Sequence, residues 1–249
     1  MRFLHTADWH IGKTLNEFSL LEDQQAVFAQ IEQIAQQEQV DAVVVAGDLY
    51  DRSIPSEAAV KELNGMLRRL NLTDHFPVLA ISGNHDSATR LSTGADWFAR
   101  SSFYLNTDLA SAFTPVTIKD TQFFLLPFFC IQAVRNYFHD ERIKTVNDAM
   151  ERIVAEMQKA FLADKHHVLV AHFFAAGSQR TADSETLIEV GGLSAVATSL
   201  LAPFDYVALG HLHNRNALNE ERIKYSGSPL KFSVSEARQE KGVWLVDTD

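Results

Sequence analysis

Residues 40–51 read Val40-Asp41-Ala42-Val43-Val44-Val45-Ala46-Gly47-Asp48-Leu49-Tyr50-Asp51, an apolar β-branched run that ends in an acidic turn. Such a run is typical of a strand buried on both faces of a parallel sheet. Gly47 permits a tight turn. Asp48 is therefore expected just past the carboxyl end of a strand, where open α/β sheets bind their ligands. Taken alone the signal is weak, because an aspartate in that position is often only a helix cap.

Four other groups of polar residues follow strand-like runs, and together with Asp48 they form a pattern. They are Asp8-Trp9-His10, Gly83-Asn84-His85-Asp86, His172 and Gly210-His211-Leu212-His213. A D-x-H or H-x-H pair is by itself weak evidence for a ligand site, and Asn84-His85 by itself would usually be a turn. Five such groups, each at the end of a strand, are not expected by accident.

The first hundred residues alternate between strand and helix patterns. Strands are predicted at 2–7, 41–46 and 76–81, and amphipathic helices at 18–38, 56–71 and 87–100. Apolar residues at three-to-four spacing carry the helix predictions. This alternation predicts an α/β fold with a parallel sheet and crossover helices.

The remainder of the chain has a different pattern. A hairpin is predicted at 113–118 and 122–126, helices at 130–138 and 145–163, and buried strands at 167–171 and 206–209. Strands near 215–218, 222–226 and 242–247 suggest an antiparallel closing sheet. Repeats, low-complexity segments and linkers are not evident, so residues 1–249 are expected to form one domain of layered sheets flanked by helices.

Composition limits the class of protein. The chain has 249 residues with 46% hydrophobic and 22% charged content, no apolar run of membrane-spanning length and no secretory signal at its start. The single cysteine, Cys130, excludes an internal disulfide and fits a reducing cytoplasm. The formal charge of −10 counts against a protein that passively coats nucleic acid. It counts less against a metallonuclease, since bound cations would neutralise part of the acid.

The polar groups at the strand ends have the composition of a metal site. They offer seven oxygen and imidazole ligands without a thiolate, a mixture that suits Mn²⁺, Fe or Zn²⁺. The seven are Asp8, His10, Asp48, Asn84, His172, His211 and His213. One ion does not need so many, so a two-metal centre is predicted, with Asp48 as the bridging carboxylate. Such a centre can activate a hydroxide and hold the oxygens of a phosphate ester.

Other polar residues receive weaker interpretations. Asp51 and Asp86 are expected to orient ligands or His85, although helix capping explains Asp51 equally well. Five further histidines lack a motif and are interpreted as core or surface residues: His5, His75, His139, His166 and His167.

The order D-x-H, G-D-x-x-D, G-N-H-D, strand-end H and G-H-x-H resembles the calcineurin-like metallophosphoesterase superfamily. Within it, residues 5–13, 47–52, 210–213 and 225–243 resemble the nuclease subunits that bacteria pair with a coiled-coil ATPase. The five motifs are specific to the superfamily, and residues 225–243 carry the narrower resemblance, which spans essentially the whole chain.

This resemblance implies roles for individual residues. Asp8, His10, Asp48 and His213 would hold one ion, and Asp48, Asn84, His172 and His211 the other. His85 would lie over the substrate phosphate and Asp86 would orient it. The relatives use Mn²⁺, degrade double-stranded DNA ends in the 3′-to-5′ direction and cut single-stranded or hairpin DNA. They act in DNA repair, recombination and replication as dimers with the ATPase.

Two features limit this transfer. Such nucleases generally continue into a DNA-facing cap and an ATPase-binding segment, so residues 1–249 are expected to be the nuclease core of a longer protein. The acidic chain also lacks a concentrated basic stripe. Candidate phosphate contacts are Arg52, Arg90, Arg180 and Lys231, and solvated surface charge explains each of them equally well.

The resemblance also suggests a homodimer through helices 56–70 and 87–100. Their apolar residues exceed what a peripheral helix needs, with ordinary core packing as the alternative: Leu63, Met66, Leu67, Leu70, Leu91, Trp97 and Phe98. For function, the leading hypothesis is a Mn²⁺-dependent DNA nuclease. The alternatives are a small-molecule or nucleotide phosphoesterase and an inactive scaffold. The scaffold is disfavoured because every ligand is present.

Overall fold

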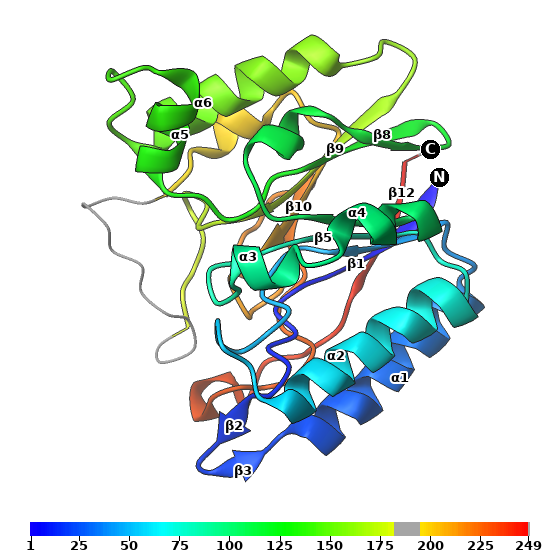
Figure 1. The fold of residues 1–249 in the computed structure, drawn as a ribbon. Helices are drawn as coiled ribbons and strands as arrows, with labels where there is room; N and C mark the ends of the chain where they lie inside the picture. The colour runs from blue at the N-terminus through cyan, green and yellow to red at the C-terminus, as the bar shows by residue number, and fades with distance from the viewer. Residues whose placement is uncertain (182–194, 249) are drawn as a thin grey trace.

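Two five-stranded sheets pack face to face in the computed structural model, which describes residues 1–181 and 195–248 (Figure 1). The first sheet has the order β12-β1-β4-β5-β6, whose strands span Trp244–Asp247, Arg2–Thr6, Ala42–Val45, Val78–Ile81 and Phe103–Asn106. The second has the order β11-β10-β9-β8-β7, spanning Ile223–Tyr225, Tyr206–Gly210, His166–His172, Thr121–Leu125 and Val116–Ile118. This arrangement confirms the predicted α/β fold of layered sheets.

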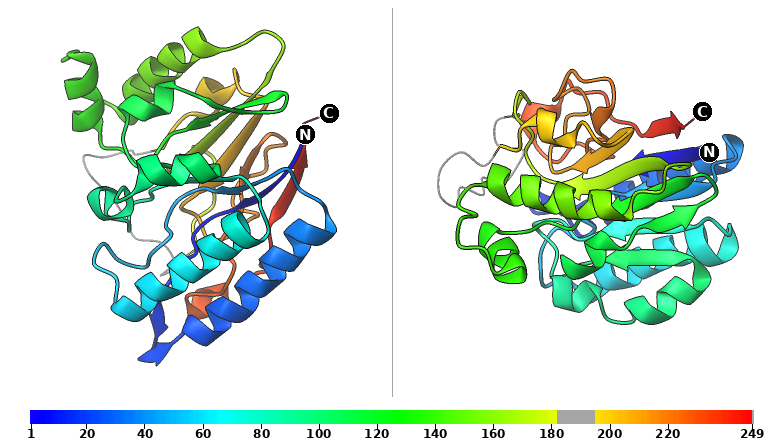
Figure 2. Two further views of the ribbon diagram at one scale, coloured as in Figure 1. Left: turned by 45° about the vertical axis from the view of Figure 1, so that its right-hand side comes forward. Right: turned by 90° about the horizontal axis from the view of Figure 1, so that it is seen from above.

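Helices cover the outer face of each sheet (Figures 1 and 2). The apolar faces of α1 (Leu21–Gln37) and α2 (Glu57–Arg68) pack on the first sheet, and those of α5 (Ile131–Phe138) and α6 (Val146–Met157) on the second. Shorter helices are α3, α4 and η1 to η6, at Ala88–Leu91, Ala95–Phe98, Arg69–Thr73, Ala99–Ser101, Ala110–Phe113, Gln158–Ala160, Thr198–Leu201 and Val234–Glu236. Among the residues that the structure describes, no helix has the length and apolar character needed to cross a bilayer.

A separate apolar core joins the two sheets. Phe3 of β1 packs edge-on against Phe123 of β8 with ring centroids 5.3 Å apart. Val44 of β4 and Val170 of β9 belong to the same fully buried cluster. Because the central strands β4, β5 and β10 are buried on both faces, they are continuously apolar, which explains why residues 42–46 lack the alternation of a half-exposed strand.

Three predicted helix boundaries are wrong. Residues 18–19 are not helical, because β3 (Phe18–Ser19) pairs with β2 (Thr14–Leu15) in a hairpin that precedes α1. The predicted helix at 87–100 divides into α3 and α4 at Gly94, whose φ of 88° interrupts the helical backbone. The helix predicted at 145–163 ends as α6 and η4, at Ala160.

The predicted antiparallel closing sheet is also wrong. Strand β11 pairs parallel with β10 in the second sheet, while β12 pairs antiparallel with β1 in the first. Residues 215–217 form a turn and a bend, and residues 215–218 contain no strand. The pairing of β12 with β1 brings the two ends of the chain side by side, as Figure 2 shows.

Candidate metal centre

The seven predicted ligands meet where the two sheets end. Asp8 and His10 follow β1, Asp48 follows β4 and Asn84 follows β5, all in the first sheet. The other three come from the second sheet, where His172 is the last residue of β9 and His211 and His213 follow β10. Parallel strands place their carboxyl ends at one edge, so one position in the fold collects residues that are distant in sequence.

One half of this centre is built around His10 and His213, and we call it the His10–His213 half. The Nε2 atoms of these two rings lie 3.1 Å apart. The Asp8 carboxylate lies within 4.8 Å of a nitrogen of each ring. All three side chains are almost completely buried.

The other half is built around Asn84, His172 and His211, and we call it the Asn84–His172 half. The Asn84 Oδ1 atom lies 3.0 Å from His172 Nε2 and 3.0 Å from His211 Nδ1. The His172 ring donates from Nδ1 to the Ala46 carbonyl at 2.8 Å, which leaves Nε2 directed into the centre.

Asp48 lies between the two halves. Its Oδ2 atom is 3.6 Å from His10 Nε2 and 3.3 Å from His172 Nε2. Its Oδ1 atom accepts a hydrogen bond from the His85 backbone at 2.8 Å. A single carboxylate oxygen thus faces a ligand nitrogen of each half, which is the geometry expected of a bridging residue.

The donor set fits two divalent ions. The donor pairs His10–His213, Asn84–His172, Asn84–His211, Asp48–His10 and Asp48–His172 are 3.0–3.6 Å apart, and Asp8 lies within 4.8 Å of His10 and His213. Metal–nitrogen bonds of about 2.1 Å place two neighbouring donors on one ion about 3 Å apart. Two buried imidazole nitrogens facing each other, as in His10 and His213, are an arrangement that a shared cation stabilises. Carboxylate, amide and imidazole ligands without thiolate suit Mn²⁺, Fe or Zn²⁺.

The backbone is strained at the centre. Four ligand residues have left-handed φ angles, which non-glycine residues rarely adopt: Asp8 at 53°, His10 at 45°, Asp48 at 52° and His211 at 97°. Backbone hydrogen bonds stabilise two of them, from Asp8 to the Gly47 carbonyl and from His10 to the Asp48 carbonyl, each at 3.0 Å. These bends turn the ligands toward one point.

Glycines allow the loops to approach each other closely. A Cβ atom on Gly83 would lie 2.2 Å from Asp48 Oδ1, and one on Gly210 would lie 2.0 Å from the Ala46 carbonyl oxygen. A Cβ on Gly47 would lie 2.4 Å from His172 Nδ1. The glycines of the three motifs are therefore required by packing around the ligands.

Electrostatics in the centre follow from burial. Burial raises the pKa of Asp8 to about 6 and lowers the pKa of His211 to about 3. Burial also lowers the pKa of His10 well below its ordinary value. For His172, burial opposes protonation, but the Asp48 carboxylate outweighs it and raises the His172 pKa to about 9. The same contact holds the pKa of Asp48 below its ordinary value, despite burial.

The motif residues His85, Asp86 and Asp51 lie beside the ligands. The His85 ring is perpendicular to that of His10, with centroids 4.7 Å apart, and its Nδ1 donates to the Asp51 carbonyl at 2.7 Å. Asp86 is expected from the sequence to orient ligands or His85. Its carboxylate accepts backbone N–H groups of Gly83, Leu49 and Tyr50 at 2.9–3.1 Å and so joins the loops that follow β4 and β5. Burial, with the nearby Asp48 charge, raises the pKa of Asp86 to about 6.

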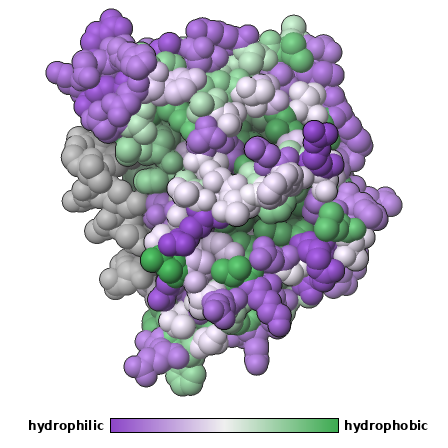
Figure 3. All heavy atoms as spheres, viewed as in Figure 1, coloured by the Kyte–Doolittle hydropathy of each residue, from purple (hydrophilic) through white to green (hydrophobic). Residues whose placement is uncertain are grey.

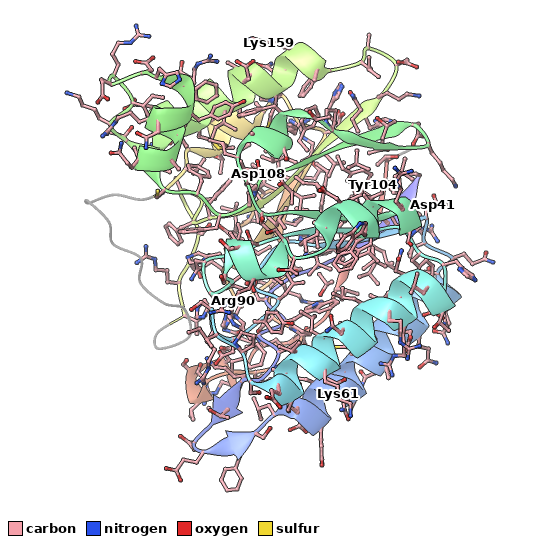
Figure 4. All side chains as sticks on the ribbon, viewed as in Figure 1. Asp41, Lys61, Arg90, Tyr104, Asp108 and Lys159 are labelled. Atoms are coloured by element: carbon pink, nitrogen blue, oxygen red, sulfur yellow. The ribbon has the colours of Figure 1, made fainter. Side chains whose placement is uncertain are left out.

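The four basic candidates have different surroundings. Arg52 is exposed and pairs with Asp51 at 3.4 Å, next to the centre. Lys231 donates to the Ala237 carbonyl at 2.6 Å, and Arg180 lies over the Phe174 ring. Figure 4 shows Arg90 on α3, above α2 in that view. Arg52 has a contact that links it to the centre, because the Oδ1 atom of its partner Asp51 lies 3.8 Å from His10 Nδ1.

Sequence reasoning did not assign roles to several residues that contact the centre. Lys13 pairs with Asp51 at 2.9 Å, and the Phe232 ring lies 5.3 Å from that of His10 and 5.6 Å from that of His213. Glu236 and Lys241 lie behind His213. Because these contacts join residues up to 222 positions apart without a recognisable spacing, the available signal was the family resemblance of residues 5–13 and 225–243.

Comparison with known proteins agrees with this geometry. The model of the family described as calcineurin-like phosphoesterase matches residues 1–215. A protein of Staphylococcus epidermidis described as the SbcD subunit of the nuclease SbcCD is 40% identical over all 249 residues, and the chain spans 66% of that relative's length. This match confirms the narrower resemblance found in the sequence.

A solved structure described as a dimetal phosphatase from Danio rerio has a similar fold. It superposes with a TM-score of 0.54 at 12% identity, covering 93% of this chain and 88% of the other. At that identity the likeness concerns the fold alone. Since the family model covers most of the chain and every motif falls in one centre, the chain belongs to the calcineurin-like phosphoesterase family.

Proposed function

We propose that this chain is a metal-dependent DNA nuclease that hydrolyses phosphodiester bonds at a two-metal centre. The observation that carries the proposal is Asp48, whose Oδ2 atom faces His10 Nε2 and His172 Nε2 at 3.6 and 3.3 Å. In our proposal Asp8, His10, Asp48 and His213 hold one ion, and Asp48, Asn84, His172 and His211 hold the other. The ions are proposed to be Mn²⁺, in keeping with the mixed oxygen and imidazole ligands.

The ions, when bound, would polarise the phosphate and supply a hydroxide at neutral pH. The residues of the chain would do the remaining work. His85 donates from Nδ1 to the Asp51 carbonyl, and in our proposal its Nε2 atom acts on the phosphate or on the leaving oxygen. The Asp51 carbonyl thereby sets the ring's orientation, and Asp86 holds the loop that carries His85 through three backbone hydrogen bonds.

The DNA substrate is proposed from the Staphylococcus epidermidis relative, whose description names the nuclease SbcCD. By that likeness, the chain degrades double-stranded ends in the 3′-to-5′ direction, cuts single-stranded and hairpin DNA, and acts with the coiled-coil ATPase SbcC in DNA repair, recombination and replication. The proposed compartment is the cytoplasm, where an exposed single thiol such as Cys130 stays reduced. Arg52, Arg90, Arg180 and Lys231 remain candidates for phosphate contacts, and Arg52 has the best position.

We also propose a homodimer through α2 and the segment from α3 to α4. An apolar groove of about 670 Å³ lies between them, and Figure 3 shows hydrophobic surface in this region. Its lining includes exposed apolar side chains of Ile54, Leu72 and Trp97, which are 68%, 55% and 78% exposed. Of the residues predicted for this contact, Leu63, Met66 and Leu70 are instead fully buried in the core. Light scattering at micromolar concentration tests the dimer, and a monomeric mass for this chain contradicts it.

The decisive experiment for the nuclease compares DNA with a small ester. End-labelled double-stranded DNA, hairpin DNA and bis-p-nitrophenyl phosphate are incubated with Mn²⁺, Mg²⁺ or EDTA. We expect Mn²⁺-dependent degradation of DNA that disappears in Asp48→Ala. Hydrolysis of the small ester with intact DNA would contradict the nuclease proposal for this chain and favour a small-molecule phosphoesterase.

A further inference from the structure

Residues 226–241, which we call the tail segment, fold against the loop that carries His213. They follow β11 and are drawn in orange to red in Figure 1. Gly227, at a φ of 72°, comes so close that a Cβ atom there would lie 2.6 Å from the His213 carbonyl oxygen. The Ser228 backbone donates to that same oxygen at 3.1 Å. The tail segment is therefore in direct contact with the backbone of a ligand residue.

The tail segment also contacts the His213 side chain. The Oε1 atom of Glu236 accepts a hydrogen bond from His213 Nδ1 at 3.1 Å, and Glu236 is completely buried. A carboxylate can only accept in this contact, so His213 carries its proton on Nδ1 and directs the Nε2 lone pair toward His10. A buried carboxylate is costly unless it is paired, so its place behind a ligand calls for an explanation.

Lys241 supplies the compensating charge. Its Nζ atom lies 2.5 Å from Glu236 Oε2, 2.9 Å from the His213 carbonyl oxygen and 2.9 Å from Ser228 Oγ. The lysine side chain is only 11% exposed. One ammonium group thus fixes the carboxylate, the ligand's backbone and the tail segment together.

The Asn84–His172 half is oriented differently. There the Nδ1 atom of His172 donates to a main-chain carbonyl, that of Ala46 at the end of β4. A carboxylate partner makes a histidine a more basic ligand than a neutral carbonyl does, and such partners typically change metal affinity about 10–100-fold. The two halves therefore have orienting groups of different charge.

We propose that Glu236 and Lys241 are positioning residues that set the metal affinity of the His10–His213 half selectively. Glu236 fixes the tautomer and orientation of His213, and Lys241 pairs with the buried Glu236 and holds it in place. The proposal rests on the two-metal centre proposed above. It gives the tail segment a role at the metal centre that is distinct from contact with the substrate.

The test is metal binding, which needs no DNA. Mn²⁺ is titrated into metal-free protein, with free Mn²⁺ measured by electron paramagnetic resonance and binding heat by calorimetry. For Glu236→Gln we expect one of the two sites to weaken by about 10–100-fold while the other keeps its affinity. The matched control is Glu240→Gln in the same segment, whose carboxylate is 82% exposed and pairs with Arg215, and it should bind like the unaltered protein.

A second pair of variants tests whether Lys241 acts by orienting Glu236 and His213 or only by stabilising the fold. Lys241→Met should weaken the same site, and Lys241→Arg should restore part of the affinity. If both residues act through His213, the double variant Glu236→Gln with Lys241→Met binds no more weakly than Glu236→Gln alone. Should Glu236→Gln fail to fold, as circular dichroism would reveal, Lys241→Met and Lys241→Arg carry the test.

Unchanged binding at both sites, or equal weakening of both, would overturn the proposal. Its failure is distinguishable from failure of the proposed nuclease. Normal binding of two ions by the unaltered protein without DNA cleavage refutes the nuclease and leaves the role of Glu236 open to the same measurement.

Discussion

The two halves of the metal centre orient their histidines through different groups, a main-chain carbonyl in one half and a carboxylate in the other. In the Asn84–His172 half, the ring of His172 is set by a strand-end carbonyl, and Gly47 and Gly210 let neighbouring strands come into contact with it. In the His10–His213 half, His213 is set by the side chain of Glu236 in the tail segment. One half depends on the ends of the sheets, and the other also depends on a segment without regular sheet structure.

This difference indicates which half of the centre can change its metal affinity by substitution without loss of the fold. The strand ends are fixed by the same hydrogen bonds and buried apolar side chains that hold the sheets, so altering them costs stability. The Glu236 carboxylate lies outside both sheets, in η6, so altering it leaves the strand pairing in place. Four substitutions test this contrast, from the largest expected effect to the smallest.

Asp48→Ala should impair metal binding in both halves equally, because Asp48 faces a ligand nitrogen of each half. We expect loss of both ions and a fall in phosphodiesterase activity of more than about 10³-fold. Calorimetric titration with Mn²⁺ measures the binding. His172→Ala serves for comparison and should remove the ion of its own half first. Retention of two ions by Asp48→Ala would refute the bridging assignment.

His85→Gln should leave both halves intact and remove only the chemistry. The ring contacts the Asp51 carbonyl and stands beside His10 without belonging to the proposed ligands. Activity should fall about 10²–10⁴-fold, the range typical of a lost general acid or base. Two bound ions, counted in the same titration, should remain. Full activity in this variant would contradict the proposed role of His85.

Gly210→Ala should damage the half that depends on strand ends. The added methyl group meets the Ala46 carbonyl oxygen and the ring of His172, and backbone atoms cannot move aside easily. We expect a loss of about 1–3 kcal/mol in the free energy of unfolding, measured with urea on metal-free protein. Gly65→Ala is the matched control: it lies within α2 with open space around it, so it should stabilise by about 0.5–1 kcal/mol. Equal effects of the two would show that close approach at Gly210 is not needed.

His5 lies in the interface between the sheets, apart from both halves, and near neutral pH its effect is the smallest. It is fully buried against the Tyr206 hydroxyl at 3.0 Å, and burial lowers its pKa to about 3. The unfolded chain takes up a proton at His5 near pH 6.5, whereas the folded chain does so only near pH 3. This residue therefore lowers stability as the pH falls from about 6.5 to 3, by up to about 1.4 kcal/mol per pH unit.

His5→Gln should accordingly lose less stability than the unaltered protein between pH 7 and 5. Urea unfolding in EDTA at several pH values measures this difference. His166→Gln, at a partly exposed position, is the control and should follow the unaltered protein. Parallel stability curves for His5→Gln and the unaltered protein would show that burial of His5 does not contribute to acid sensitivity.

The strand ends were predictable because local sequence determines them. The apolar run before Asp48 and the glycine within it already indicate a buried strand and a tight turn. The same reasoning located all seven residues that the structure brings together. Helix limits were less accurate, because pairing decides them: Phe18 carries an apolar side chain at helical spacing, yet it lies in a hairpin strand and is 76% exposed.

The pairing of the last two strands, β11 and β12, could not be predicted from local sequence. Residues 223–225 and 244–247 have similar strand patterns, yet one joins the second sheet and the other the first. Which sheet accepts a strand depends on the edge that remains open after the rest has folded. The contact of Glu236 with His213 has the same origin, since two short loops must meet before either residue acquires its partner.

The proposed ligands come from both sheets, and that origin has a consequence for folding thermodynamics. Asp8, His10, Asp48 and Asn84 follow strands of one sheet, while the other three histidines belong to the second. Each ion would therefore act as a cross-link between two layers that are also joined by apolar packing and by hydrogen bonds such as that of His5 with Tyr206. Binding to the folded chain at a hundred times the dissociation constant adds about 2.7 kcal/mol of stability. The rise in melting temperature across a metal titration therefore measures how much stability the bound ions add to the packing of the two sheets.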